Sequence, residues 1–299
     1  MRDEIIRWLL EEKNPEIKLR TQTELLNVDR TEREQTVKLV TASEDFAKMR
    51  LLLNEQKPWP VCNALTAFAE WGLTKEEVET DRYVDWIIEN TGFKLHCGEG
   101  MLLRTLVKLG YGGDERIKRE IQEIFGGLNQ DGGFQCISTN RKINAPDRPH
   151  KSCYRLPATY LLLLAELKLH LLQPAFEQVF LKYEQTFMEY FLKRNILFRT
   201  DDPSRLVVEE YDKTYFPTDC IAHGVQEILY ACSVLGYGNT AACESAWELA
   251  GRHRTQEGKY LLAARPSKPY FKVGTKGREN KWVTLYMLLA EKYRDCSDF

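Results

Sequence analysis

The chain of 299 residues is long enough to bury a sizeable core, and its 43% hydrophobic and 29% charged residues are typical of a globular protein. A formal net charge of -2, without a run of lysine and arginine, argues against a nucleic-acid-binding protein. The N-terminal 20 residues lack the uninterrupted apolar stretch of a secretory signal, and the longest apolar run, Tyr160 to Ala165, is too short to span a bilayer. We therefore expect a cytoplasmic protein whose eight cysteines stay reduced.

Helical spacing of apolar residues recurs along most of the chain, whereas alternating strand patterns are scarce. Residues 1–56 contain three predicted helical segments. They are residues 5–10, residues 15–26 and a charged segment at about 31–54. Pro15 suits the first turn of the second segment, because proline is tolerated there and not in a helix interior.

Residues 57–299 repeat one unit: a mostly apolar helix, a turn, a more polar helix and a short loop that joins glycine to an aromatic residue. The apolar helices are predicted at LTAFAEWGL, LLRTLVKLGYGG, ATYLLLLAELKLH, ILYACSVLGYGN and WVTLYMLLAEKY. The more polar helices are predicted at YVDWIIEN, DERIKREIQEIFGG, FEQVFLKYEQTFMEYFLKRN and AACESAWELAGRHR. The loops include TGF, DGGF and EGKY.

An apolar helix must be buried, whereas a helix with a polar face belongs at the surface. The alternation therefore predicts an all-α fold, an α/α toroid of about five to six helix hairpins with inner and outer rings, in one domain over residues 1–299. An open solenoid is the alternative. Residues 137–151, 199–215 and 264–280 interrupt the pattern and are expected to be functional loops.

Several of these segments resemble a known family. LNQDGGFQC resembles the Gln-x-x-Gly-aromatic repeat of the terpenoid cyclase and protein prenyltransferase superfamily of α/α toroids. In their order along the chain, PEIKLRTQTELL, CGEGMLLRTLVKLGYGGDERI, KSCYRLPATYLLLLAEL, YFPTDCIAHGVQEIL and ENKWVTLYMLL resemble small bacterial squalene-cyclase-like proteins. The resemblance implies a central cavity for a small apolar or isoprenoid-like molecule and a prenyltransferase- or cyclase-like activity.

Two motifs of that superfamily are absent or altered. Its cyclases use an Asp-x-Asp-Asp acid, and the sequence has only the pair Asp201-Asp202, which we interpret as a solvated turn. Its prenyltransferases hold zinc with Asp-x-Cys and a distant histidine, whereas Asp219 and Cys220 are adjacent here. A cyclase would therefore need another acid, such as Asp131 or Asp219.

Three cysteines indicate a metal site. Cys97, Cys136 and Cys153 each lie at or just before the start of a predicted inner helix, and in a toroid these starts gather at one mouth. Helix N-termini favour the thiolate, and three thiolates with His223 as the fourth ligand would suit zinc better than an iron–sulfur cluster. The competitors for the fourth position are Asp219, Cys220 and His96. The alternative is that the thiols are simply buried or redox-active.

Arg104 lies within an apolar helix pattern and needs an anionic partner, either a carboxylate such as Glu99 or a substrate phosphate. We predict catalytic roles for Arg104 and Asp219. The aromatic residues expected to line the cavity are Trp59, Tyr154, Tyr160, Phe216 and Trp282. Three hypotheses follow: a metal-dependent enzyme, a cyclase proper, and a non-catalytic ligand-binding or scaffold toroid with structural cysteines.

Overall fold

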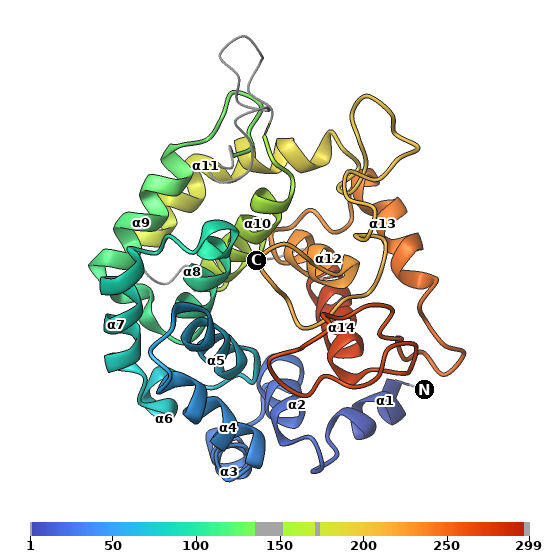
Figure 1. Ribbon diagram of the computed structural model, residues 1–299. Coiled ribbons are helices and arrows are strands. Elements are labelled where there is room, and N and C mark those ends of the chain that lie inside the picture. The colour runs from blue at the N-terminus through green and yellow to red at the C-terminus, as the bar shows by residue number, and fades with distance from the viewer. Residues whose placement is uncertain (1, 135–151, 171–173, 296–299) are drawn as a thin grey trace.

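The computed structural model describes residues 2–134, 152–170 and 174–295, and this part of the chain is all-helical, with isolated β-bridges and no strand (Figure 1). Its α-helices are α1 (Arg2–Leu9), α2 (Pro15–Arg20), α3 (Arg30–Thr41), α4 (Glu44–Leu53), α5 (Pro58–Glu70), α6 (Lys75–Val78), α7 (Asp81–Thr91), α8 (Glu99–Lys108), α9 (Glu115–Gly126), α10 (Arg155–Leu169), α11 (Pro174–Leu192), α12 (Val225–Val234), α13 (Ala241–Gly251) and α14 (Lys281–Asp295). A π-helix, η1 (Thr21–Leu26), continues α2. Within the described residues, no helix is both long and apolar enough to cross a membrane.

Local sequence explains where several helices begin. Pro15 occupies the first turn of α2, as predicted. The side chains of Asp29 and Ser43 accept hydrogen bonds from the backbone N–H groups of Glu32 and Phe46, and so cap α3 and α4. The charged segment predicted at about 31–54 is therefore two helices, because Ser43 provides a second helix start.

The apolar helices α5, α8, α10, α12 and α14, here called the inner helices, follow one another around the centre of Figure 1. Each packs against the next, and α14 also contacts α2 and η1. The more polar α3, α4, α7, α9, α11 and α13 lie farther from the centre (Figure 1). At the contact of α8 with α10, a Cβ atom on Gly100 would lie 2.5 Å from Thr159 Oγ1, so only glycine allows this close approach.

The inner helices run in the same direction. Cys62 and Cys97, at the starts of α5 and α8, both lie close to Cys220, just before α12. At the other end, Lys108 Nζ lies 3.8 Å from both Glu70 Oε2 and Glu166 Oε1, which brings together the ends of α8, α5 and α10. We call the side where Cys62, Cys97 and Cys220 lie the start face.

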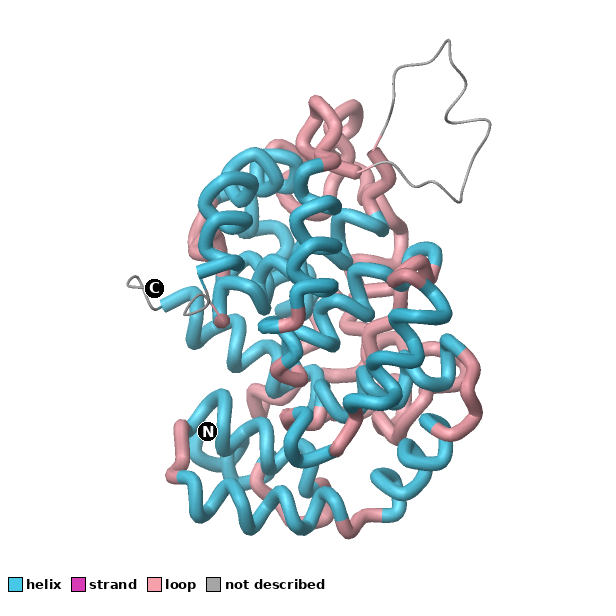
Figure 2. Tube along the Cα trace, turned by 90° about the vertical axis from the view of Figure 1, so that its left-hand side faces the viewer, coloured by secondary structure: helices cyan, strands magenta, loops and turns pink. Residues whose placement is uncertain are grey.

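Two irregular segments lie on the start face, residues 212–224 before α12 and residues 261–280 before α14. Most loops gather on the right-hand side of Figure 2, while α14 ends on the left-hand side. The two segments are joined by a hydrogen bond of 2.9 Å from Ala264 N to Thr214 O and one of 3.0 Å from Tyr270 Oη to Thr218 O. Residues 199–215 and 264–280 are loops, as predicted, and residues 137–151 lie outside the described part.

Candidate functional site

Arg104 lies in a buried ion cluster at the centre of the inner helices. Its Nη1 atom is 2.9 Å from Glu70 Oε1, and its Nη2 atom is 3.4 Å from Glu166 Oε1. Arg20, from α2, binds the other oxygen of Glu70 at 3.0 Å. The structure thus provides protein carboxylates for Arg104, as the sequence required, but they are Glu70 and Glu166 rather than Glu99. The ion cluster, as named below, consists of Arg20, Glu70, Arg104, Lys108 and Glu166.

The ion cluster holds Glu70 in its charged form. Burial disfavours a charged carboxylate, but Lys108, Arg104 and Arg20 lower the pKa of Glu70 to about 2. Tyr286 of α14 adds a hydrogen bond of 2.5 Å from its hydroxyl to Glu70 Oε2. Helices that are distant in sequence are therefore tied together through one carboxylate.

Glu227 is a second buried carboxyl group, in the first turn of α12. One of its oxygens accepts a hydrogen bond of 3.2 Å from Gly224 N, and the other accepts the hydroxyl of Thr218. Burial raises the pKa of Glu227 to about 7, against the opposing charge of Arg104. A carboxyl group whose pKa is raised toward neutrality is suited to general acid–base catalysis.

Glu227 is not among the site residues predicted from the sequence. The available signal was an acid within the apolar pattern VQEILYACSV, where a charged side chain facing the inner helices needs a partner or a raised pKa.

Three aromatic side chains form a cluster beside this site. The rings of Phe216 and Trp282 are stacked with their centroids 5.1 Å apart, and Phe271 lies 5.9 Å from Phe216 and 5.7 Å from Trp282. We call these three residues the aromatic cluster. Phe216 is two residues from Thr218, the partner of Glu227, so the aromatic cluster and the carboxyl group share one segment.

Other aromatic residues predicted to line a cavity lie elsewhere. Tyr160 packs against Phe134 with centroids 4.6 Å apart, and Tyr154 packs against Tyr211 at 5.8 Å. Trp59 is 38% exposed at the start of α5. Of the five candidates, only Phe216 and Trp282 belong to the aromatic cluster.

Glu99, at the start of α8, forms a carboxyl pair with Glu120. Tyr160 donates a hydrogen bond of 2.7 Å to Glu99 Oε2. Glu120, on the outer helix α9, is hydrogen-bonded to Glu99, and burial together with this neighbour raises the pKa of Glu120 to about 7. Glu99 and Glu120 therefore link an inner helix to an outer helix.

The predicted metal ligands are placed only in part. Cys136 and the side chain of His96 lie outside the described residues. The backbone N–H of Cys153 donates a hydrogen bond of 3.0 Å to Phe134 O. Cys97 lies near Cys220. Among the residues that the structure describes, no group of three or more histidine, cysteine, aspartate or glutamate side chains is arranged to hold a metal ion.

The thiol of Cys220 differs from the thiolates expected at helix starts. Burial raises its pKa to about 12, and the neighbouring charges of Asp219 and Cys97 act in the same direction. Cys220 is therefore protonated at neutral pH when no metal is bound. It would have to lose this proton to become a metal ligand.

His223 is a buried residue whose ring nitrogens could bind a metal ion or a substrate. It is fully buried just before α12, and neither of its ring nitrogens has a hydrogen-bond partner within the described residues. Burial, together with the charges of Arg104 and Arg155, lowers its pKa to about 3, so the imidazole is neutral. Its ring meets that of Tyr211 edge-on, with centroids 5.7 Å apart. A neutral imidazole with free nitrogens is the form that binds a metal or a substrate hydroxyl.

Asp219 has a structural role in this conformation. One of its oxygens accepts hydrogen bonds of 2.8 Å from the backbone N–H groups of Ile221 and Ala222, and the other accepts one of 2.8 Å from Tyr215 Oη. These bonds shape the turn that leads into α12. The Asp201-Asp202 pair also forms a turn, in which Asp202 accepts from Ser204.

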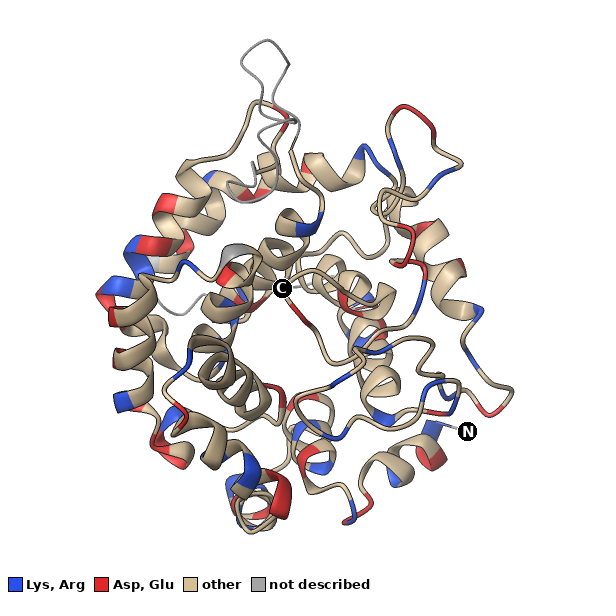
Figure 3. Cartoon of the chain, viewed as in Figure 1, with Lys and Arg blue, Asp and Glu red and all other residues tan. Residues whose placement is uncertain are grey.

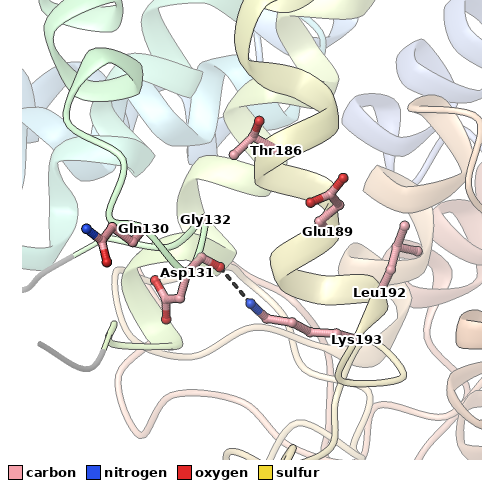
Figure 4. A pocket seen from close by; sticks show the side chains of 7 residues that line it. All are labelled: Gln130, Asp131, Gly132, Thr186, Glu189, Leu192 and Lys193. Atoms are coloured by element: carbon pink, nitrogen blue, oxygen red, sulfur yellow. Dashed lines mark hydrogen bonds between the residues drawn. The ribbon is translucent and has the colours of Figure 1, made fainter. Parts of the chain in front are cut away.

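Asp131 borders a surface cavity of about 400 Å³ between its loop and α11 (Figure 4). Its carboxylate accepts hydrogen bonds from Gly133 N at 3.1 Å and Ser152 Oγ at 2.6 Å, and Lys193 Nζ binds its backbone oxygen at 2.8 Å. The cavity wall consists of Gln130, Asp131, Gly132, Thr186, Glu189, Leu192 and Lys193. It belongs to the outer layer of the fold, away from the aromatic cluster.

Comparison with known proteins gave no relative: no protein family, curated protein or solved structure matches the sequence.

Proposed function

We propose that the chain is an α/α toroid similar to the terpenoid cyclases and protein prenyltransferases, and that it transfers a proton to or from a small, largely apolar molecule through Glu227. The toroid is supported by the common direction of the inner helices and by the contact of α14 with α2 and η1, at the two ends of the chain. The observation that carries the chemistry is the placement of Glu227, a fully buried carboxyl group that accepts hydrogen bonds from Thr218 and Gly224 N beside the aromatic cluster, where burial raises its pKa.

The surroundings of Glu227 favour an apolar or isoprenoid-like molecule as the ligand. The faces of Phe216, Phe271 and Trp282 offer the apolar contact and can stabilise positive charge that develops on protonation. Since the three rings and Glu227 are buried, the proposal requires that a neighbouring part of the chain, such as residues 212–224 or 261–280, moves to admit the ligand. Arg104, in the ion cluster, favours the ionised form of Glu227 once the proton has left.

Glu227→Gln tests this function, because the amide keeps the size of the side chain and cannot transfer its proton. With squalene, farnesyl diphosphate and geranylgeranyl diphosphate as probes, we expect the wild type to bind one of them in native mass spectrometry and to convert it. The variant should retain binding and lose at least about a hundredfold in turnover. Asp131→Asn and Asp219→Asn serve as controls and should remain active.

Equal turnover by the wild type and Glu227→Gln would exclude Glu227 as the acid. Binding of a probe without turnover by the wild type would instead favour a non-catalytic ligand-binding toroid.

A zinc enzyme is the second candidate, favoured by the unpartnered ring nitrogens of His223. In this proposal Cys97, Cys136, Cys153 and His223 hold the ion, which would supply Lewis-acid chemistry at the start face. Elemental analysis should then find about one zinc per chain. The content should fall in Cys97→Ser, Cys153→Ser and His223→Gln, and remain in the control Cys243→Ser. Metal-free wild-type protein, purified without chelator, would argue against this candidate.

A further inference from the structure

Residues 264–280, on the start face, form a strongly basic segment, called the basic segment below. It contains a single acid, Glu279, which Lys259 Nζ binds at 2.7 Å. Its five cations are Arg265, Lys268, Lys272, Lys276 and Arg278. Since the whole chain has a formal net charge of -2, this local excess is not a property of the protein as a whole.

All five cations are exposed, and none of them forms an ion pair with a carboxylate of the described residues. Figure 3 shows the blue positions along the loop that crosses in front of α14 and α2. Like charges gathered on one short segment repel one another, and no carboxylate of the described residues lies within ion-pair distance to offset them. An anionic partner would offset this repulsion.

The basic segment is held in a defined shape. Phe271 and Val273 are buried and anchor it to the fold. Near its ends, Gly277 N binds Leu262 O at 2.7 Å, and Leu262 N binds Arg278 O at 2.9 Å. The cations therefore project from an ordered frame, and binding a partner does not require the segment to fold first.

Exposed apolar side chains lie on the same face of the molecule. Trp59, at the start of α5, is 38% exposed, and Ile221, just before α12, is 45% exposed. Tryptophan is enriched where a protein meets the headgroup layer of a membrane, and basic clusters bind anionic headgroups. A nucleic acid would match the cations but not these apolar side chains.

We propose that the basic segment docks the start face on a bilayer that contains anionic phospholipids. The attraction comes from the five cations, and Trp59 and Ile221 make shallow contacts with the headgroup layer. Docking in this way turns the starts of the inner helices toward the lipid. The proposal concerns a surface and is independent of the chemistry proposed for Glu227.

Vesicle co-sedimentation of the full chain tests the proposal. The wild type should bind vesicles of mixed phosphatidylserine and phosphatidylcholine, should bind pure phosphatidylcholine vesicles much more weakly, and should be released by added salt. The combined change Lys268→Glu, Lys272→Glu and Lys276→Glu should weaken binding by roughly a hundredfold or more.

A matched control carries the same change of charge elsewhere: Lys38→Glu, Arg119→Glu and Lys182→Glu, at exposed positions of α3, α9 and α11. It should bind nearly as well as the wild type, and circular dichroism should give the same helical signal for all three proteins. The proposal is overturned if both triple variants bind equally, if binding does not depend on phosphatidylserine, or if the wild type prefers duplex DNA to the vesicles.

Discussion

Replacing Arg104 with methionine is expected to lower the free energy of unfolding by about 3–5 kcal/mol, measured by urea denaturation at neutral pH. Arg104 binds Glu70 at 2.9 Å and lies 3.4 Å from Glu166, and all three side chains are buried. Without the guanidinium group, two buried carboxylates lose a counter-charge that water cannot replace. The main cost is the desolvated charge that remains, rather than the packing of the arginine.

Arg116→Met is the matched control. Arg116 also contacts two carboxylates, those of Asp85 and Asp114, but its side chain is 40% exposed. Water screens these pairs, so the loss should be below about 1 kcal/mol. If Arg104→Met and Arg116→Met lowered the free energy of unfolding equally, the ion cluster would not behave as a buried network.

The double variant Glu70→Met with Arg104→Met separates the two contributions. Removing both partners should cost less than the sum of the single changes, because the remaining buried charge is smaller. Additive losses would show that Glu70 and Arg104 contribute independently.

The helices were predictable because the local pattern decides them. The alternation of apolar and half-polar segments gave the inner and outer helices in the right order, and Pro15 marked the start of α2. The break between α3 and α4 was missed, since apolar spacing continues through it and only the Ser43 cap interrupts the backbone. The closed toroid and its likeness to the cyclases remain predictions.

The candidate site was only partly predictable, because it depends on contacts between distant helices. The need of Arg104 for an anion follows from its apolar surroundings. Its partner Glu70 is 34 positions away in the chain, on another helix, and is found only once the helices are packed. Glu99, the nearer candidate, is bound by Tyr160 instead.

The raised pKa of Glu227 could not be predicted from the sequence pattern. Its raised pKa comes from burial, to which residues 212–224 contribute through the contact with Thr218. These residues have no periodic pattern, so the sequence predicts a loop there without placing it. The coordination predicted for Cys97, Cys153 and His223 remains a prediction, because Cys136 lies outside the described part of the chain.

Between pH 4.5 and pH 7, the free energy of unfolding of the wild type is expected to fall by about 3 kcal/mol because of Glu227. In Glu227→Gln this decrease should be absent. The ordinary pKa of 4.5 applies to the unfolded chain, and the folded value is about 7. The folded state therefore binds the proton more tightly. Its contribution to stability is complete below pH 4.5 and disappears as the pH rises through 7.

The measurement is the difference in unfolding free energy between wild type and Glu227→Gln across this range, which cancels the other titrating groups. Glu120→Gln should give a change of the same sign but smaller, because Glu120 is only half-buried. Parallel pH profiles for wild type and Glu227→Gln would mean that Glu227 has an ordinary pKa. Glu227 would then be ionised at neutral pH and could act only as a proton acceptor, so a stability measurement tests the proposed role as proton donor before any substrate is known.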